Sequence, residues 1–112
     1  MIASVSGEIS QILDGQIVIN LSGLGLLINV TENTCLESHL GKPLALHTYL
    51  VVREDQLALY GFATPEERDL FIHLISVAGI GPKTGLAALS TLSPETVRRA
   101  ITADKPEIFA RV

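Results

Sequence analysis

Over the first 62 residues, apolar side chains recur in short runs that alternate with polar ones, with β-branched residues frequent among them. This period of two is typical of β-strands. Asp14-Gly15 is a dipeptide suited to a tight hairpin turn, and Arg53-Glu54-Asp55 separates the last two runs. The pattern predicts strands over residues 2–13, 16–21, 26–30, 44–52 and 56–62.

Two segments interrupt these strands. Residues 22–25, Ser-Gly-Leu-Gly, break the second run from the third. Residues 31–41 lack strand character and contain Cys35, Leu36, His39 and Leu40, whose three-to-four spacing predicts one or two turns of helix. Three strands, a short helix and two strands are the layout of a five-stranded OB-type barrel. A generic small β-barrel is the alternative.

After Phe62 the apolar period changes to that of helices. Thr64, Pro65 and Glu67 predict an N-cap, a proline in the first turn and a capping carboxylate. Pro82 and Ser93-Pro94 predict two further helix starts. The inner faces expected are Leu70, Phe71, Leu74, Ile75 and Ala78, then Leu86, Ala87 and Leu89, then Val97, Ala100 and Ile101.

The first helix should end near Ala78, and residues 104–107 resemble a fourth helix start. Because only five residues follow, we expect the chain to stop inside that helix and to be a fragment. The predicted architecture is therefore a β-barrel plus α-helices: an OB-fold domain over residues 1–62 and a helix-hairpin-helix domain over residues 63–112, incomplete at its C-terminus.

Composition and charge limit the classes of protein to which this chain can belong. Hydrophobic residues make up 47% of the 112 residues and charged ones 18%, enough apolar material for a core. No stretch reaches the ~18 apolar residues of a membrane span, no signal peptide is recognisable, and Cys35 is the single cysteine, so we expect a soluble cytoplasmic protein with no membrane partner. The net charge of −4 lies entirely in residues 1–62, which leaves no broad basic face; a nucleic-acid site must be small and local.

The segment Gly79-Ile80-Gly81-Pro82-Lys83-Thr84 has the pattern of a helix-hairpin-helix turn. Two glycines permit the sharp turn while Ile80 fills the space between the helices. The backbone amides at the start of the second helix would bind a DNA phosphate, to which Lys83 and Thr84 add a cation and a hydroxyl. The alternative is a hairpin whose glycines serve packing alone. Walker A and Rossmann phosphate motifs do not match this segment.

Other candidates are weaker. The residues alone favour an ordinary solvated turn at Glu54 and Asp55 over an acidic element that repels phosphates. No metal or cofactor site is predicted, because His39, His47 and His73 lack ligand spacing and Cys35 with His39 supplies at most two ligands. No catalytic residues are predicted, because serine and histidine occur without a nucleophile elbow or a recognisable triad. Tyr49, Tyr60 and Phe62 are too few for stacking on single strands. Leu24, Leu26 and Leu27 suit either a subunit contact or the core.

Several motifs occur together in the order found in one bacterial family. They are Met1-Ile2 with Gly7, Gly23-x-Gly25, Val51-Val52-Arg53-Glu54-Asp55, Leu59-Tyr60-Gly61-Phe62, Glu67-Arg68 with Leu70-Phe71, and Gly79-Ile80-Gly81-Pro82-Lys83. In these motifs the chain resembles the RuvA family, the Holliday-junction recognition subunits of the RuvAB branch-migration machinery. The resemblance covers essentially all of the sequence.

The resemblance implies a non-catalytic subunit in DNA recombination and repair. It implies homotetramers, sometimes paired, that hold a four-way junction open, with RuvB ATPase and RuvC resolvase as partners. Glu54 and Asp55 match the family's acidic pin, which reverses the preference for a solvated turn, and Gly79, Gly81, Lys83 and Thr84 match its first DNA-binding hairpin. By this resemblance we expect the second hairpin to follow residue 112 and the chain to be the N-terminal part of such a subunit, without the RuvB-binding domain. Residues 3–6 lack the basic residue that other members often carry. A pure assembly core with little DNA binding of its own is the alternative.

Overall fold

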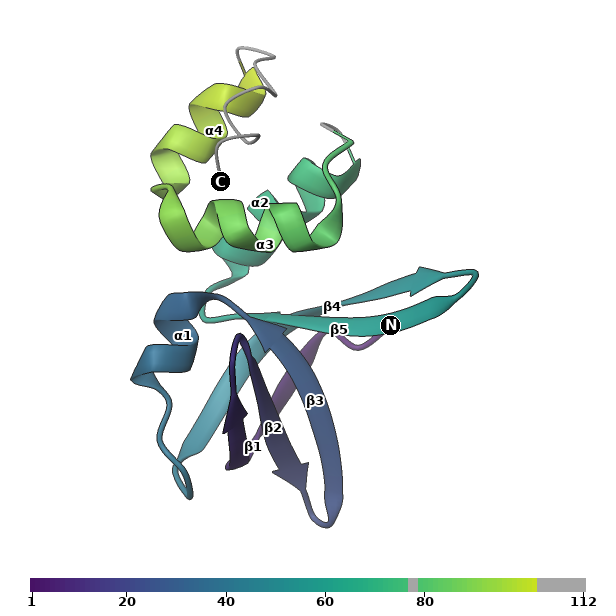
Figure 1. Cartoon of the computed structure of the whole chain (residues 1–112), viewed down its shortest axis with the longest axis vertical. Helices are drawn as coiled ribbons and strands as arrows, with labels where there is room; N and C mark the ends of the chain where they lie inside the picture. Colours follow the sequence, from purple (N-terminus) through teal and green to yellow (C-terminus); the bar gives the residue numbers. More distant parts are fainter. Residues whose placement is uncertain (77–78, 103–112) are drawn as a thin grey trace. The chain divides into compact units, whose positions relative to one another are not determined.

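A computed structural model of the chain describes residues 1–76 and 79–102. The chain divides into two compact units, Met1–Pro65 and a second unit that starts at Glu66 (Figure 1). None of the helices described is long and apolar enough to cross a membrane.

The first unit is a closed barrel in which the strands follow the order β1-β2-β3-β5-β4. The strands are β1 (Ser4–Leu13), β2 (Gln16–Leu21), β3 (Leu24–Val30), β4 (Pro43–Arg53) and β5 (Gln56–Phe62), with α1 (Glu32–Glu37) between β3 and β4. All neighbours are antiparallel except β3 and β5, which are parallel. The predicted five-stranded barrel followed by helices is confirmed.

The barrel interior is filled by alternate residues of each strand, as the pleat requires. Its core consists of Val5, Ile17, Ile19, Ile28, Val30, Leu46 and Leu59. Gly61 lies where strands approach closely, because a Cβ there would meet Ile28 Cγ2 at 2.8 Å and Leu46 Cδ1 at 2.9 Å. The barrel wall therefore needs a residue without a side chain at this point.

The turn between β2 and β3 is shorter than expected. Ser22 and Gly23 adopt positive φ angles of 54° and 102°, and Asn20 Oδ1 accepts a hydrogen bond from the Gly23 N–H at 2.7 Å. Leu24 and Gly25 already belong to β3. The prediction that all of residues 22–25 interrupt the strands was wrong, because two residues with positive φ suffice for a tight hairpin.

The short helix predicted within residues 31–41 is α1, which ends at Glu37, before His39 and Leu40. Leu36, His39 and Leu40 are exposed, whereas Cys35 is half-buried and packs against the barrel core. The buried residues of this segment are Thr31, Thr34 and Ser38. Their burial is tolerated because the Thr34 N–H donates to Thr31 Oγ1 at 3.3 Å and Ser38 Oγ donates to the Thr34 carbonyl at 2.6 Å.

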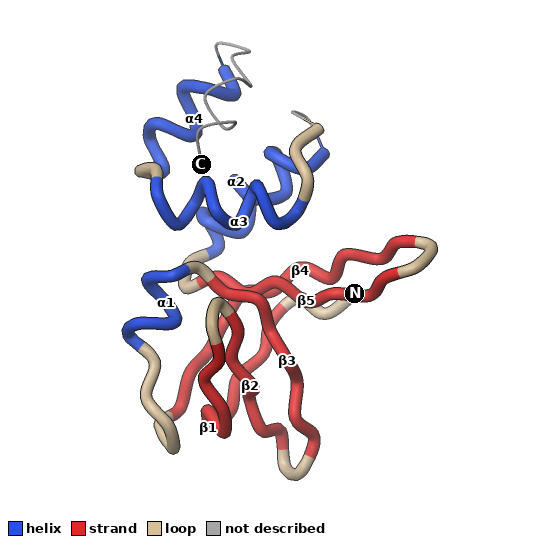
Figure 2. Tube along the Cα trace, viewed as in Figure 1, coloured by secondary structure: helices blue, strands red, loops and turns tan. Residues whose placement is uncertain are grey.

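The second unit contains α2 (Pro65–Ser76), α3 (Pro82–Thr91) and α4 (Pro94–Thr102) (Figure 2). Its core consists of Leu70, Leu74, Ala88, Val97 and Ala100, with Ile80, Leu89, Leu92 and Ile101 packed against it. Prolines open all three helices as predicted. Capping of α2 by Thr64 stays a prediction. The expected helix end near Ala78 and the helix start at residues 104–107 lie outside the described residues.

The inner face of α3 differs from the prediction. Gly85 and Ala88 are its buried residues, whereas Leu86 and Ala87 are half-buried. A Cβ on Gly85 would lie 3.5 Å from ring atoms of Phe71. Leu89, the third residue predicted for this face, is half-buried and packs against the helical core. Gly85 faces Phe71 of α2, a contact that the apolar period does not mark because glycine carries no side chain.

Candidate nucleic-acid interface

The Gly79-Ile80-Gly81 segment leads directly into α3. Gly79 has a φ of 68°, in the left-handed region that favours glycine. The N–H of Ile80 donates to the carbonyl of Leu74 at 2.9 Å, and the half-buried Ile80 side chain packs against the helical core. The predicted role of Ile80 as the apolar residue between the two helices agrees with this position.

Both glycines of the turn leave their backbone accessible. A Cβ added to Gly79 or to Gly81 would meet no atom within 4 Å, so neither glycine is needed for close packing. This observation counts against the alternative in which the two glycines serve packing alone. Among the residues that the structure describes, no atom within 4 Å of either Cβ position blocks the approach of an anion to this backbone.

The N-terminus of α3 lacks a side-chain cap. Gly81 is the N-cap residue and makes no side-chain hydrogen bond, Pro82 has no N–H, and the first helical hydrogen bond runs from the Gly85 N–H to the Gly81 carbonyl at 2.8 Å. Within the described chain, the N–H groups of Lys83 and Thr84 have no acceptor. These free donors and the helix dipole make the position attractive to an anion.

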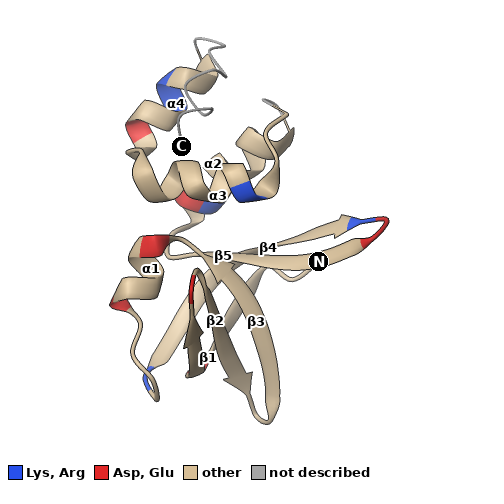
Figure 3. Cartoon of the chain, in the orientation of Figure 1, with Lys and Arg blue, Asp and Glu red and all other residues tan. Residues whose placement is uncertain are grey.

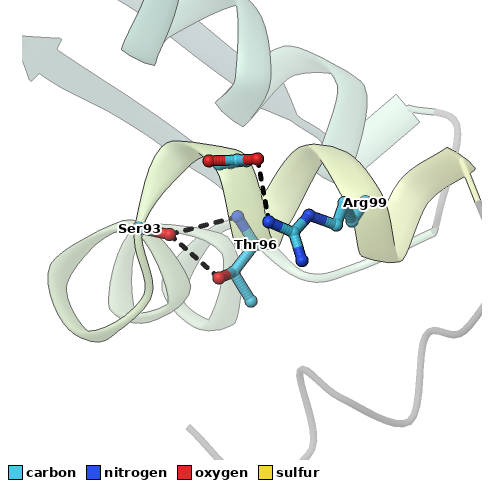
Figure 4. Close-up of polar contacts among 4 residues, drawn as sticks. Ser93, Thr96 and Arg99 are labelled. Carbon is cyan, nitrogen blue, oxygen red and sulfur yellow. Dashed lines mark hydrogen bonds and ion pairs between the residues drawn. The ribbon is translucent and has the colours of Figure 1, made fainter.

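The other two helix starts of this unit are unsuitable for an anion. In α4, Ser93 Oγ accepts the Thr96 N–H at 3.1 Å and lies 2.9 Å from Thr96 Oγ1, so the cap is already satisfied (Figure 4). The first turn of α4 carries Glu95, and that of α2 carries Glu66 and Glu67. The first turn of α3 has no acidic residue.

The basic side chains of the helical unit differ in whether they form an ion pair. Arg68 pairs with Asp69 at 3.5 Å, Arg98 with Glu66, and Arg99 with Glu95 at 2.8 Å. Among residues 66–76 and 79–102, Lys83 is the lysine or arginine without an ion pair, and both it and Thr84 are exposed. The structure thus brings together an unpaired ammonium, a hydroxyl and free amides on one helical turn.

Glu54 and Asp55 form the turn at the tip of the β4–β5 ribbon, after the last strand pair, Arg53 with Gln56. Both carboxylates are exposed, and Figure 3 shows the acidic residues at the far end of the ribbon. β3 pairs with β5 only from Leu59 to Gly61, so the outer part of the ribbon has no third strand. The acidic tip belongs to the barrel unit and the Lys83 site to the helical unit.

Other candidate residues take structural positions. Tyr60 and Phe62 are buried and Tyr49 is half-buried, so they offer no stacking surface. Burial raises the pKa of Tyr60 above its ordinary value, and the charge of Arg53 opposes that shift. Leu24 and Leu27 are exposed, whereas Leu26 packs against the barrel core. No group of three His, Cys, Asp or Glu side chains among the described residues could hold a metal ion.

A closed OB-type barrel followed by a helical unit, with an open helix N-terminus after a Gly-Ile-Gly turn, defines a protein of the OB-fold plus helix-hairpin-helix class. The model of one family, described as the RuvA N terminal domain, matches residues 1–61. The chain belongs to this family.

Curated relatives extend the similarity beyond the barrel. The chain is 46% identical over all 112 residues to the Holliday junction branch migration complex subunit RuvA of Micrococcus luteus, and 41% identical over the same length to that of Renibacterium salmoninarum. It is 42% identical over 101 residues, 90% of its length, to that of Staphylococcus aureus strain Newman. The chain spans about half the length of these relatives, 52%, 52% and 50% respectively.

Proposed function

We propose that this chain is the DNA-binding part of a non-catalytic subunit that recognises four-way junctions, holds them open and supports RuvB-driven branch migration in recombination and DNA repair. The observation that carries the proposal is the uncapped start of α3 with its unpaired Lys83, in a chain 46% identical to a branch migration subunit. The proposed domains are the OB-fold at residues 1–62 and the helix-hairpin-helix unit at residues 63–112.

The hairpin residues Gly79, Ile80, Gly81, Lys83 and Thr84 bind one DNA phosphate in this proposal. The free N–H groups of Lys83 and Thr84 donate to its oxygens, and the Lys83 ammonium adds a charge-assisted contact. These contacts position the backbone and carry no sequence information. They suit a ligand that is recognised by its shape.

Glu54 and Asp55 act as an acidic pin. Two carboxylates at an exposed tip repel phosphates, so a duplex is disfavoured where the tip lies, whereas an open crossover leaves space for it. Neither phosphate binding at α3 nor repulsion at the acidic tip needs a cofactor, because side chains and backbone amides of the chain supply both.

The assembly proposed is a cytoplasmic homotetramer, alone or paired across the DNA, which would place several hairpins around one junction. The exposed Leu24 and Leu27 are candidate subunit contacts. RuvB is the motor partner proposed for the complete subunit, and RuvC is a further partner.

The test is a titration of labelled four-way junction and matching duplex with the chain and with Lys83→Glu. The control is Lys42→Glu, an equal charge change at an exposed residue of the barrel unit. The proposal expects salt-sensitive junction preference that Lys83→Glu lowers about tenfold or more and Lys42→Glu leaves near the parent value. If the parent chain binds neither DNA, the assembly-core alternative is correct for this chain. If both variants weaken binding equally, the assignment to the α3 site is wrong.

A further inference from the structure

The β4–β5 ribbon leaves the barrel at a short junction. β5 pairs with β4 along its whole length, from Phe62 opposite His47 to Gln56 opposite Arg53. Its pairing with β3 covers only Ile28 with Leu59 through Val30 with Gly61. Between Leu59 and the acidic turn at Glu54 and Asp55, β5 is therefore paired with β4 alone. The parallel contact between β3 and β5 closes the barrel.

One side chain reinforces that junction. Asn29 Nδ2 donates a hydrogen bond to the carbonyl oxygen of Leu59 at 3.1 Å, and Asn29 Oδ1 accepts one from Gln16 Nε2 at 3.0 Å. Asn29 lies opposite Gln16 on β2 and opposite Tyr60 on β5, so its half-buried amide connects β2, β3 and β5. Both the donor and the acceptor of the amide are used.

The location of this amide matters because a short displacement at the root is amplified at the tip. At about 3.3 Å per residue, Asp55 lies roughly 13 Å along β5 from Leu59. A tilt of about 10° at the root would move the carboxylates by roughly 2 Å, using the same strand rise. Two-stranded ribbons are marginal on their own, so the direction of the tip depends on how firmly its root is held.

We propose that Asn29 is a positioning residue for the acidic tip: its amide, held by Gln16, fixes β5 at Leu59 and so sets where Glu54 and Asp55 lie. This inference rests on the proposed pin function but concerns a residue that touches no DNA. It requires that loss of the amide change junction preference without changing the phosphate contacts of α3.

The experiment compares Asn29→Leu, Asn29→Asp and Asn20→Leu in the whole chain. Asn29→Leu removes both hydrogen bonds at similar size, and Asn29→Asp keeps an acceptor for Gln16 but loses the donor to Leu59. Asn20→Leu is the matched control. The Asn20 side chain also makes a hydrogen bond to backbone, the 2.7 Å bond from the Gly23 N–H, but that bond lies at the β2–β3 turn and not at the root of the ribbon. The measurements are amide NMR order parameters of residues 56–58 and the ratio of duplex to junction Kd.

Both Asn29 variants should lower the order parameters of residues 56–58 from about 0.85 toward about 0.6, while Asn20→Leu should not. The ratio of duplex to junction Kd should fall about two- to tenfold, the range that one net hydrogen bond supplies, because a displaced tip repels a duplex less. An unchanged preference in both Asn29 variants, or an equal fall in Asn20→Leu, overturns the inference even if the ribbon becomes more mobile. If the parent chain itself shows no junction preference, the proposed function fails, and unchanged order parameters would then separately refute the anchoring of the ribbon.

Discussion

The N–H of Ile80 donates a hydrogen bond to the carbonyl of Leu74 at 2.9 Å, which ties the turn between α2 and α3 back onto α2. Gly79, the residue before Ile80, has a φ of 68°, a backbone conformation that side chains disfavour.

Gly79 and Gly81 should therefore respond differently to alanine. Gly79→Ala should lower the free energy of unfolding by about 1–2 kcal/mol, the cost of the left-handed region for a side chain, although space around it is free. Gly81 has a φ of −66°, so Gly81→Ala should change stability by less than about 1 kcal/mol.

The two variants also separate stability from binding. The added methyl group of Gly81→Ala lies at the proposed phosphate site and should weaken junction binding in a protein whose free energy of unfolding changes by less than about 1 kcal/mol. Thermal unfolding followed by circular dichroism, together with junction titration, measures both effects. Unaltered junction affinity in Gly81→Ala would argue against backbone recognition at this turn.

Two other glycines should respond with opposite signs. Gly61→Ala forces a methyl group against Ile28 and Leu46 at less than 3 Å and should destabilise the barrel by about 1–3 kcal/mol. Gly85→Ala places a methyl group at an ordinary 3.5 Å from Phe71 within α3 and should stabilise the helical unit by up to about 1 kcal/mol. Urea unfolding of both variants checks the signs; a loss of stability in Gly85→Ala would mean that α3 cannot accept the methyl group.

Neutralising the acidic tip should change which DNA is preferred. Glu54→Gln with Asp55→Asn removes two negative charges at an exposed turn, so repulsion of a duplex should decrease. Duplex affinity should rise several-fold at low salt and less at high salt, because exposed charges are screened. Glu32→Gln with Glu37→Gln, at the exposed α1, is the control of equal charge. A junction-to-duplex ratio equal to that of the parent chain would refute the pin.

Tyr60 should make stability depend on alkaline pH. Because burial raises its pKa in the folded chain, the phenol holds its proton more tightly when folded than when unfolded. The corresponding stability is fully present below the unfolded pKa of about 10 and is lost as pH rises from there through the folded pKa. Tyr60→Phe removes the titration, so its unfolding free energy should fall less between pH 9 and 11 in urea titrations. Parallel pH profiles for both proteins would contradict this linkage.

Much of the architecture follows from local patterns in the sequence. The period-two runs, the Asp14-Gly15 turn and the prolines at 65, 82 and 94 placed most strands and the helix starts near their observed bounds. Strand pleating, turn geometry and proline chemistry act over a few residues, so they can be read without knowing what else is nearby. The Gly-Ile-Gly turn could be recognised for the same reason.

The tertiary structure decided which residues meet across the fold. The polar residues Thr31, Thr34 and Ser38 are buried while Leu36 and Leu40 are exposed, because hydrogen bonds available only in the folded segment satisfy the buried hydroxyls. A lone asparagine in an apolar strand was the signal for Asn29, but its bond to Leu59 depends on the parallel pairing of β3 with β5. The sequence by itself determined the elements and their turns; burial, capping and the anchoring of the acidic tip depend on contacts between residues far apart in the chain, which only the packed structure specifies.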